Sequence, residues 1–412
     1  MSEPIHYLNL RDLSGRIRAQ DLSPVDVVDA ALARIEAFQS RLNAFITVLA
    51  DDARARAKEA QDEIRGGTWR GPLHGVPVGI KDFYDTANVR TTAAFERFKD
   101  RIPVRDAVAV AALQAAGAIV IGKMNMHQLG MGTTGLEGDF GPVQNPWNAA
   151  YIPGGSSSGS AAAVAAGLCY ATLDTDAIGS CRLPAACCGV VGFKGTYGAI
   201  SAGGILDGEP VDPAIIWMSH PGITTRSARD TAIVLDVLAT PEARTEMSDL
   251  SADRTTQAPL RIGVADNAKA DAAVVRGIAA AVATIRSLGH ETVSAAAPFD
   301  IPRMGDLHRI EADRASIAER AFKKIDVLLL PTLTTTVPAV KDVRGNPQAL
   351  SPAHTMFANY FGLPAISMPC GFDTRDLPIG LQIVGKPWHD ATVLRLARQY
   401  EIAAPTNQHP LA

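Results

Sequence analysis

The chain has 412 residues, of which 47% are hydrophobic and 20% charged, and its formal net charge is −4 at pH 7. This composition is typical of soluble globular proteins and excludes disorder as the main state. The mixed charge argues against a nucleic-acid binder, which usually carries a basic patch. Five cysteines predict no disulfide framework and suit a reducing, cytoplasmic location.

No stretch of about 18 uncharged apolar residues occurs, so the sequence predicts no transmembrane helix. The first residues, MSEPIHYLNLRDL, lack an apolar core after a basic start and therefore do not resemble a signal peptide. We accordingly expect neither a membrane nor a nucleic acid as a partner.

Helical and extended patterns alternate along the chain. Ser23 predicts an N-cap, with Pro24 at the first helical position, and apolar residues then recur with helical spacing up to Ile35. Further predicted helices are residues 51–65, 107–116, 160–167, 271–288 and 390–401, and predicted strands are residues 76–81, 118–122, 260–264, 290–296, 326–330, 365–368 and 379–384. This alternation indicates an α/β fold with a mixed, mostly parallel sheet covered by helices on both faces. Since no repeat, low-complexity tract or linker divides the chain, we expect a single domain over residues 1–412.

Three separated segments carry the chemistry. Residues 153–160 read PGGSSSGS, a Gly/Ser loop that enters a helix rich in Ala and Val. A phosphate-binding P-loop would need a Lys directly before a terminal Ser or Thr, and none is present here. Ser180 follows Ser156 by 24 positions, and Lys81 stands upstream, at the polar end of the apolar strand in HGVPVGIKD. A lone lysine at a strand end is usually a surface charge, but the combination with two spaced serines favours a site.

These segments, together with GLPAISMPCGF and LPIGLQIVG near the C-terminus, resemble the amidase signature family from about residue 8 to residue 403. The resemblance implies the amidase signature fold and a Ser–cisSer–Lys triad. Ser180 matches the nucleophile, Lys81 the buried lysine, and Ser156 the bridging serine, which in the family follows a cis peptide bond. The oxyanion hole of the family matches the backbone N–H groups of Ala177, Ile178, Gly179 and Ser180.

Elementary chemistry supports these roles. A serine hydroxyl is a weak nucleophile until a base takes its proton, and no His–Asp pair with a G-x-S-x-G elbow is evident. Lysine is a base only when neutral, which burial promotes because desolvation disfavours the charged form. Ser156 can relay protons between Lys81 and either the nucleophile Ser180 or the leaving amine.

Two departures from the family pattern stand out. Ile178 replaces a glycine in the oxyanion turn, where a β-branched residue cannot comfortably take a positive φ. The helical insertion that usually precedes the strand at Asp326 is also shortened, since only about 30 residues follow Ala296. We expect an open, shallow pocket that tolerates large substrates. Asp176 and Arg182 match positions that support the active-site loops.

The resemblance places substrate contacts in the segment KMNMHQLGMG and near Phe357, and Trp217, just before Ser219 and His220, is a further candidate for the apolar side of the pocket. Each candidate has an ordinary structural alternative: a hydrogen-bonded wall residue for the histidine, and core packing for the two aromatic side chains. The candidates are Met126, His127, Gly130, Met131, Gly132, Trp217 and Phe357. The cysteines Cys181, Cys187 and Cys188 suggest a thiol or zinc site, but adjacent cysteines are poor zinc ligands, and buried apolar packing is the favoured interpretation. We expect no metal and no cofactor.

These observations predict a serine hydrolase that cleaves C–N bonds of amides or carbamates (urethanes), favours bulky or aryl substrates, and hydrolyses esters as a side activity. Its partner would be a small-molecule substrate, and the chain a monomer or homodimer. Two alternatives remain: the A subunit of a tRNA-dependent amidotransferase, which passes ammonia to a partner, and a non-catalytic amide-binding protein.

Overall fold

The computed structural model describes residues 4–210, 212–246, 258–301, 306–406 and 408–411. Its strands are β1 Phe45–Val48, β2 Pro77–Lys81, β3 Ile119–Met124, β4 Ala171–Asp176, β5 Val191–Lys194, β6 His220–Thr225, β7 Arg261–Ala265, β8 Glu291–Ala295, β9 Val327–Pro331, β10 Ala365–Phe372 and β11 Pro378–Gly385. Its α-helices are α1 Leu10–Arg18, α2 Pro24–Leu42, α3 Ala50–Arg65, α4 Val108–Ala115, α5 Ser158–Ala165, α6 Arg182–Cys188, α7 Pro213–Met218, α8 Ala228–Leu238, α9 Pro241–Glu246, α10 Ala272–Ser287, α11 Leu307–Ala321, α12 Val340–Val343, α13 Met356–Tyr360 and α14 Asp390–Ala403.

The expected helix after Ser23 shows how local sequence sets an element. The Ser23 side chain accepts a hydrogen bond from the N–H of Asp26 at 3.0 Å, and Pro24 occupies the first helical turn. The helix runs to Leu42 and ends at Asn43, which takes the left-handed conformation with φ 50°. Its apolar face, predicted from the helical spacing, is buried.

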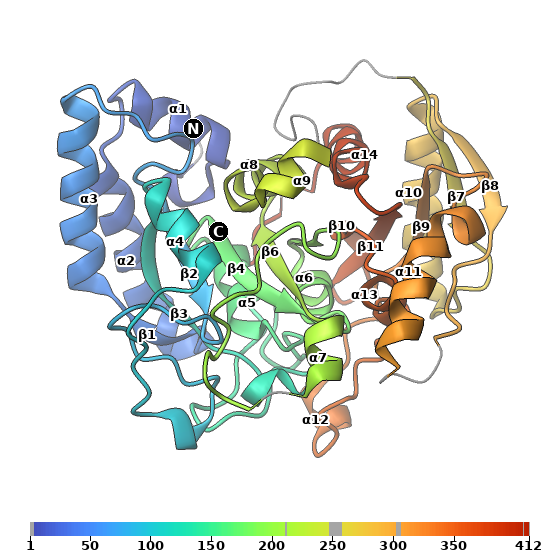
Figure 1. Ribbon diagram of the computed structural model, residues 1–412, viewed down its shortest axis with the longest axis horizontal. Helices are drawn as coiled ribbons and strands as arrows, with labels where there is room; N and C mark the ends of the chain where they lie inside the picture. Colours follow the sequence, from blue (N-terminus) through green and yellow to red (C-terminus); the bar gives the residue numbers. More distant parts are fainter. Residues whose placement is uncertain (1–3, 211, 247–257, 302–305, 407, 412) are drawn as a thin grey trace.

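All eleven strands of the described residues form one sheet, in the order β1-β3-β2-β4-β6-β5-β10-β11-β9-β7-β8 (Figure 1). The sheet is mixed, as predicted, but among these strands only four neighbouring pairs are parallel and six are antiparallel. The prediction that it is mostly parallel is therefore wrong. One reason is the short connection between β10 and β11, because only antiparallel strands can be joined by a tight hairpin. Another is β6, which inserts antiparallel between β4 and β5.

Helices cover both faces of the sheet, as predicted. One apolar core gathers residues of α1, α4, α8, α10 and α14 against the sheet, and a second gathers residues of α2, α3, α5 and α6. A third core lies under α11 and α13, next to the end of β4. The strands β2, β4 and β6 are neighbours near the middle of the sheet, and their ends position the site.

Candidate active site

Lys81, the last residue of β2, is fully buried among hydroxyl groups. Its Nζ lies 2.8 Å from Ser156 Oγ, 2.9 Å from Ser157 Oγ and 2.8 Å from Thr175 Oγ1. Parallel pairing of β2 with β4 places the end of β2 beside Thr175. The sequence reasoning missed Ser157 and Thr175 as partners of the lysine. The available signals were the position of Ser157 next to Ser156 and the presence of Thr175 in the TD pair of the motif.

Burial lowers the pKa of Lys81 from 10.5 to about 8, because an ammonium group loses its hydration in the interior. The charges of Asp174 and Asp176 act in the opposite direction without restoring the ordinary value. A lysine with a pKa near 8 supplies a useful fraction of neutral amine at mildly alkaline pH, so the group can act as a general base.

The Gly/Ser loop carries Ser156 to the lysine. The Gly155–Ser156 peptide bond is cis, as the family resemblance implied. Gly155 has no room for a side chain, since an added Cβ would lie 2.9 Å from the N atom of Gly135. The N–H of Ser157 donates to the carbonyl of Ser180 at 3.0 Å, which fixes the loop against the predicted nucleophile. Ser156 and Ser180 are 1% and 5% exposed.

Residues 177–180 form the turn between β4 and α6. The positive φ that this turn requires falls on Gly179, at 129°, so Ile178 fits without the expected conflict. The Gly179 N–H donates to Asp176 Oδ1 at 2.8 Å. Among the hydrogen bonds of the described residues, none uses the N–H groups of Ala177, Ile178 or Ser180. Three of the four predicted oxyanion donors are thus unoccupied.

A buried ion pair supports the turn from below. Arg182 Nε lies 2.9 Å from Asp176 Oδ2, and both side chains are fully buried. Burial raises the pKa of Asp176, but the charge and hydrogen bonds of Arg182 outweigh it and hold the pKa below its usual range. Asn359 adds a second support, because its Nδ2 donates to the Asp176 carbonyl at 2.7 Å and to Oδ1 at 2.9 Å. Sequence reasoning missed Asn359, which is 183 positions away from Asp176.

The segment KMNMHQLGMG, in which substrate contacts were predicted, runs next to Ser156. A Cβ added to Gly130 would lie 3.7 Å from Ser156 Oγ, so this glycine borders the hydroxyl. Met131 is 58% exposed, whereas Met126 is only 1% exposed. Gly130 therefore borders Ser156, Met131 presents surface to solvent, and Met126 belongs to the interior.

His127 is buried next to Ser156. The backbone N–H of His127 donates to the Ser156 carbonyl at 3.0 Å, and its ring Nε2 lies 3.8 Å from Glu137 Oε2. Burial, with a smaller contribution from the charge of Lys81, lowers the pKa of His127 to about 4, so the ring is neutral at pH 7. Gly132 packs on this ring so closely that a Cβ there would lie 2.1 Å from it.

The two aromatic candidates differ in position. Trp217, in α7, is half-buried and packs on the same apolar core as Ile178 of the oxyanion turn. Phe357, in α13, is fully buried and contacts Phe299 edge-on at 5.4 Å between ring centroids. The structure thus brings Trp217 near the turn and leaves Phe357 in the core.

The cysteines lie in the interior. All five are buried and free. Cys181 points away from the turn, with its Sγ 3.4 Å from the Ile223 carbonyl, and burial raises the pKa of the Cys181 thiol well above its usual value. Within the part of the chain that the structure describes, no three His, Cys, Asp or Glu side chains gather to hold a metal ion. No helix among those residues combines the length and apolar character that a membrane crossing needs.

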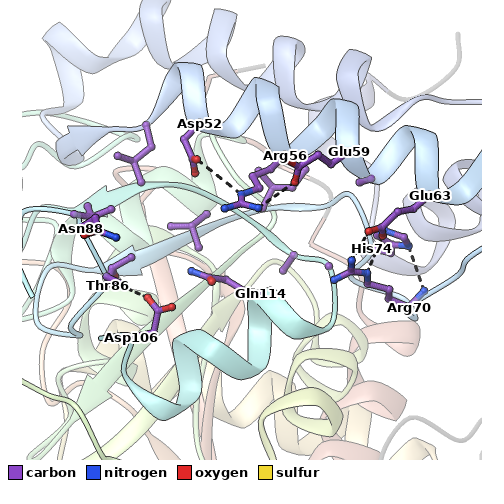
Figure 2. Close-up of a pocket in the computed structure, with 18 residues that line it drawn as sticks. Asp52, Arg56, Glu59, Glu63, Arg70, His74, Thr86, Asn88, Asp106 and Gln114 are labelled. Carbon is purple, nitrogen blue, oxygen red and sulfur yellow. Dashed lines mark hydrogen bonds and ion pairs between the residues drawn. The ribbon is translucent and has the colours of Figure 1, made fainter. Parts of the chain in front are cut away.

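A cavity of about 560 Å³ opens away from this cluster, between α3 and α4 (Figure 2). Its charged lining is largely paired internally: Arg56 lies 3.0 Å from Glu59, and Arg70 Nε donates to Glu63 at 2.8 Å. Lys81, Ser156 and Ser180 do not line this cavity. The candidate site at these three residues therefore lies outside this cavity.

The Amidase family model matches residues 26–318 and 308–394. The chain belongs to the amidase signature family. Curated relatives of this amidase-family chain include the A subunit of glutamyl-tRNA(Gln) amidotransferase from Anaeromyxobacter dehalogenans, 32% identical over 476 positions, and its counterpart from Geotalea daltonii, 33% identical over 477 positions. Both alignments cover 96% of this chain and 96% of the relative.

Solved structures of similar fold include hydrolases. A 6-aminohexanoate cyclic dimer hydrolase in complex with substrate has a TM-score of 0.85 and 25% identity, covering 99% of this chain and 100% of that one. Peptide amidase from Stenotrophomonas maltophilia has a TM-score of 0.83 and 25% identity, covering 99% of both chains.

The alignments with the curated relatives are longer than this chain. An alignment of 476 positions against a chain of 412 residues leaves at least 64 positions without a counterpart here. Between β8 and β9 the described residues hold one helix, α11. Part of that connection, residues 302–305, lies outside the described residues.

Proposed function

We propose that this chain is a serine hydrolase that cleaves the C–N bond of an amide or carbamate through an acyl-enzyme on Ser180. The observation that carries the proposal is the 2.8 Å contact between Lys81 Nζ and Ser156 Oγ, inside a buried cluster that also holds Ser180. A lysine whose pKa is lowered, joined to a second hydroxyl, is the arrangement that activates a serine without histidine.

In the proposed reaction, neutral Lys81 takes the proton of Ser156, and Ser156 takes that of Ser180 as the Ser180 Oγ attacks the carbonyl carbon. The tetrahedral intermediate then collapses, the C–N bond breaks, and Ser156 delivers its proton to the leaving nitrogen while it takes one back from the Lys81 ammonium. Water repeats the same sequence, so that the acyl–oxygen bond to Ser180 breaks and the acid departs. Each half-reaction returns Lys81 to its neutral form.

The negative charge that develops on the carbonyl oxygen needs preorganised donors. The unoccupied N–H groups of Ala177, Ile178 and Ser180 are the candidates, because the Gly179 N–H already donates to Asp176. The buried pair of Asp176 and Arg182 holds this turn in place. Loss of one such donor typically costs about 10²–10³ in kcat.

The surroundings of the turn favour an apolar substrate. Ile178, Trp217 and Met356 are half-buried and pack on one apolar core. An aryl or bulky alkyl amide or carbamate would cover this surface, and an ester with a better leaving group would react as a side activity. The shortened chain supports room for a large substrate.

A second candidate function rests on the curated relatives. Amidotransferase A subunits match 96% of this chain at 32–33% identity. In that case the chain would hydrolyse glutamine and pass ammonia to a partner. The missing positions and the apolar surface beside the turn favour an independent hydrolase, since glutamine carries two charged groups that an apolar wall does not stabilise.

The deciding experiment compares wild type with Ser180→Ala on a small primary amide, a nitroanilide, a bulky aryl carbamate and glutamine. We expect wild type to turn over the anilide and the carbamate faster than the small amide. Ser180→Ala should lower the kcat/KM for these substrates by a factor of about 10³ or more. Turnover restricted to glutamine and dependent on added partner proteins would support the amidotransferase function. A wild type that binds these amides without turnover would support the non-catalytic alternative.

A further inference from the structure

The sheet order separates two sides of the nucleophile. β2, which carries Lys81, and β6 flank β4 on opposite sides (Figure 1). His220, at the start of β6, pairs with Asp176 at the end of β4, so the chain just before β6 runs beside the oxyanion turn. Asn359 confirms this proximity, because its Nδ2 donates both to the Asp176 carbonyl at 2.7 Å and to the Met218 carbonyl at 3.3 Å.

These two sides receive different parts of a substrate under the proposed function. The leaving nitrogen must face Ser156, which protonates it, and Ser156 contacts Lys81 on the β2 side. The acyl group, attached to the other side of the carbonyl carbon, then extends toward β6. Trp217, three positions before β6 begins, belongs to the segment on this side.

The neighbours of Trp217 hold it from two directions. Its ring lies parallel to that of Tyr197, with 6.1 Å between centroids and 4° between planes. The guanidinium carbon of Arg314, from α11, lies 4.0 Å from the Tyr197 centroid and 6.0 Å from the Trp217 centroid. Arg314 Nη2 also donates to the Trp217 carbonyl at 2.6 Å, and Nε to the Tyr360 carbonyl at 2.8 Å. The indole is therefore fixed before any substrate arrives.

Ile178 packs against the same apolar core as Trp217. It replaces the glycine that the family resemblance leads one to expect in the turn, and it is half-buried. We infer that Trp217 and Ile178 form an acyl-side wall that selects a flat aromatic acyl group, and that Arg314 is a positioning residue for this wall. The inference rests on the proposed function, because the acyl side is defined by proton delivery from Ser156.

The wall distinguishes aromatic from merely apolar groups. Aromatic pairs are favoured beyond their buried area by an amount that corresponds to roughly 2- to 12-fold in an equilibrium or rate. The matched probes are the 4-nitroanilides of benzoic and cyclohexanecarboxylic acid, which share a leaving group and a ring size. Their ratio of kcat/KM in a variant, divided by the ratio in wild type, cancels the difference in intrinsic reactivity.

The variants are Trp217→Ala, Trp217→Phe and Arg314→Gln, with Trp69→Ala as the matched control. Trp69 is also half-buried and has an arginine, Arg18, at 6.0 Å from its ring centroid, but it contacts the core around α1 and α4. We expect Trp217→Ala to lower the benzoyl preference roughly 2- to 12-fold, chiefly through KM. Arg314→Gln should lower it less, and Trp217→Phe and Trp69→Ala should retain most of it.

The same two anilides are also titrated into the Ser180→Ala protein with and without Trp217→Ala, which measures binding without cleavage. A loss of benzoyl preference in the dissociation constants supports the wall even where turnover fails, so the two proposals fail separately. An unchanged preference in Trp217→Ala, in both turnover and binding, overturns the wall. Equal losses in Trp69→Ala would also overturn it, since they would reflect general loosening of the fold.

Discussion

Two buried lysines lie at the ends of neighbouring strands and differ in what surrounds them. Lys81 ends β2 and contacts three hydroxyl groups at 2.8–2.9 Å. Lys123, in β3, contacts the Tyr84 carbonyl at 2.7 Å and Thr91 Oγ1 at 2.6 Å, and its Nζ lies 3.6 Å from Asp82 Oδ1. Both are fully buried, and burial lowers the pKa of each to about 8.

The shared pKa shows that burial alone does not make a lysine a base. The carbonyl and the carboxylate beside Lys123 only accept hydrogen bonds, and its third partner, the Thr91 hydroxyl, donates its own proton to the Val89 carbonyl at 3.3 Å. This lysine therefore has a structural pairing role. A serine hydroxyl beside Lys81 can also donate its proton back to the neutral amine. The partners, not the pKa, distinguish the proposed base from the structural cation, and this distinction can be tested by removing each lysine.

The largest expected effect is on activity, from Lys81→Ala. Loss of the general base should lower the kcat/KM of the folded protein about 10²- to 10⁴-fold, while the far-ultraviolet circular dichroism spectrum stays close to that of wild type. Near wild-type turnover in this variant would refute the role of Lys81 as the base.

Lys123→Met should show the opposite pattern. It leaves Asp82 buried without its cation, and breaking a buried pair typically costs about 3–5 kcal/mol of unfolding free energy. Urea unfolding measures this loss, and the folded fraction should keep most of its kcat/KM. If Lys123→Met instead abolished activity without lowering stability, the proposed division between the two lysines would be wrong.

The pH dependence separates the lysines by a different readout. Since the pKa of Lys81 is lowered to about 8, the amine is mostly protonated at pH 7 and mostly neutral at pH 9. The active form is the neutral one, so kcat/KM should rise roughly tenfold over this range, with one inflection near 8. Lys123→Met should keep the inflection. A profile that is flat from pH 7 to 9 would contradict a titrating lysine base.

Sequence patterns predicted seven of the eleven described strands, and they missed β1 at one edge of the sheet and three neighbouring strands near its middle. Strong periodicity and caps located α2, and apolar runs located β2, β3 and β9. The central strands β4, β5 and β6 were missed, because their sequences, ATLDTD, VGFK and HPGITT, are short and mix polar residues, glycine or proline with apolar ones. Without them, the alternation of elements implied parallel neighbours, and the antiparallel pairs of β6 could not be foreseen.

The candidate site was likewise predicted only in part. The motifs pointed to Lys81, Ser156 and Ser180, which the fold brings into one buried cluster. Side chains that support the site from distant parts of the sequence carry no local signal. Asn359 contacts Asp176 from α13, and Arg314 contacts Trp217 from α11. For Ile178, the predicted strain did not arise because the adjacent Gly179 takes the positive φ.

The smallest expected effect is a shift in the pH profile when one hydroxyl beside Lys81 is removed. Thr175→Val keeps the side-chain shape but removes an acceptor 2.8 Å from Lys81 Nζ, which stabilises the charged form. The pKa of Lys81 should fall further, moving the inflection of the pH profile toward acid by about half a unit to one unit. The control is Thr91→Val, which removes the hydroxyl 2.6 Å from Lys123 Nζ and should leave the inflection in place. Because both changes remove a buried hydroxyl, any general loosening affects them equally, and only a base at Lys81 makes the profile respond to Thr175 alone. A shift of equal size in both variants would show that the inflection does not report on Lys81.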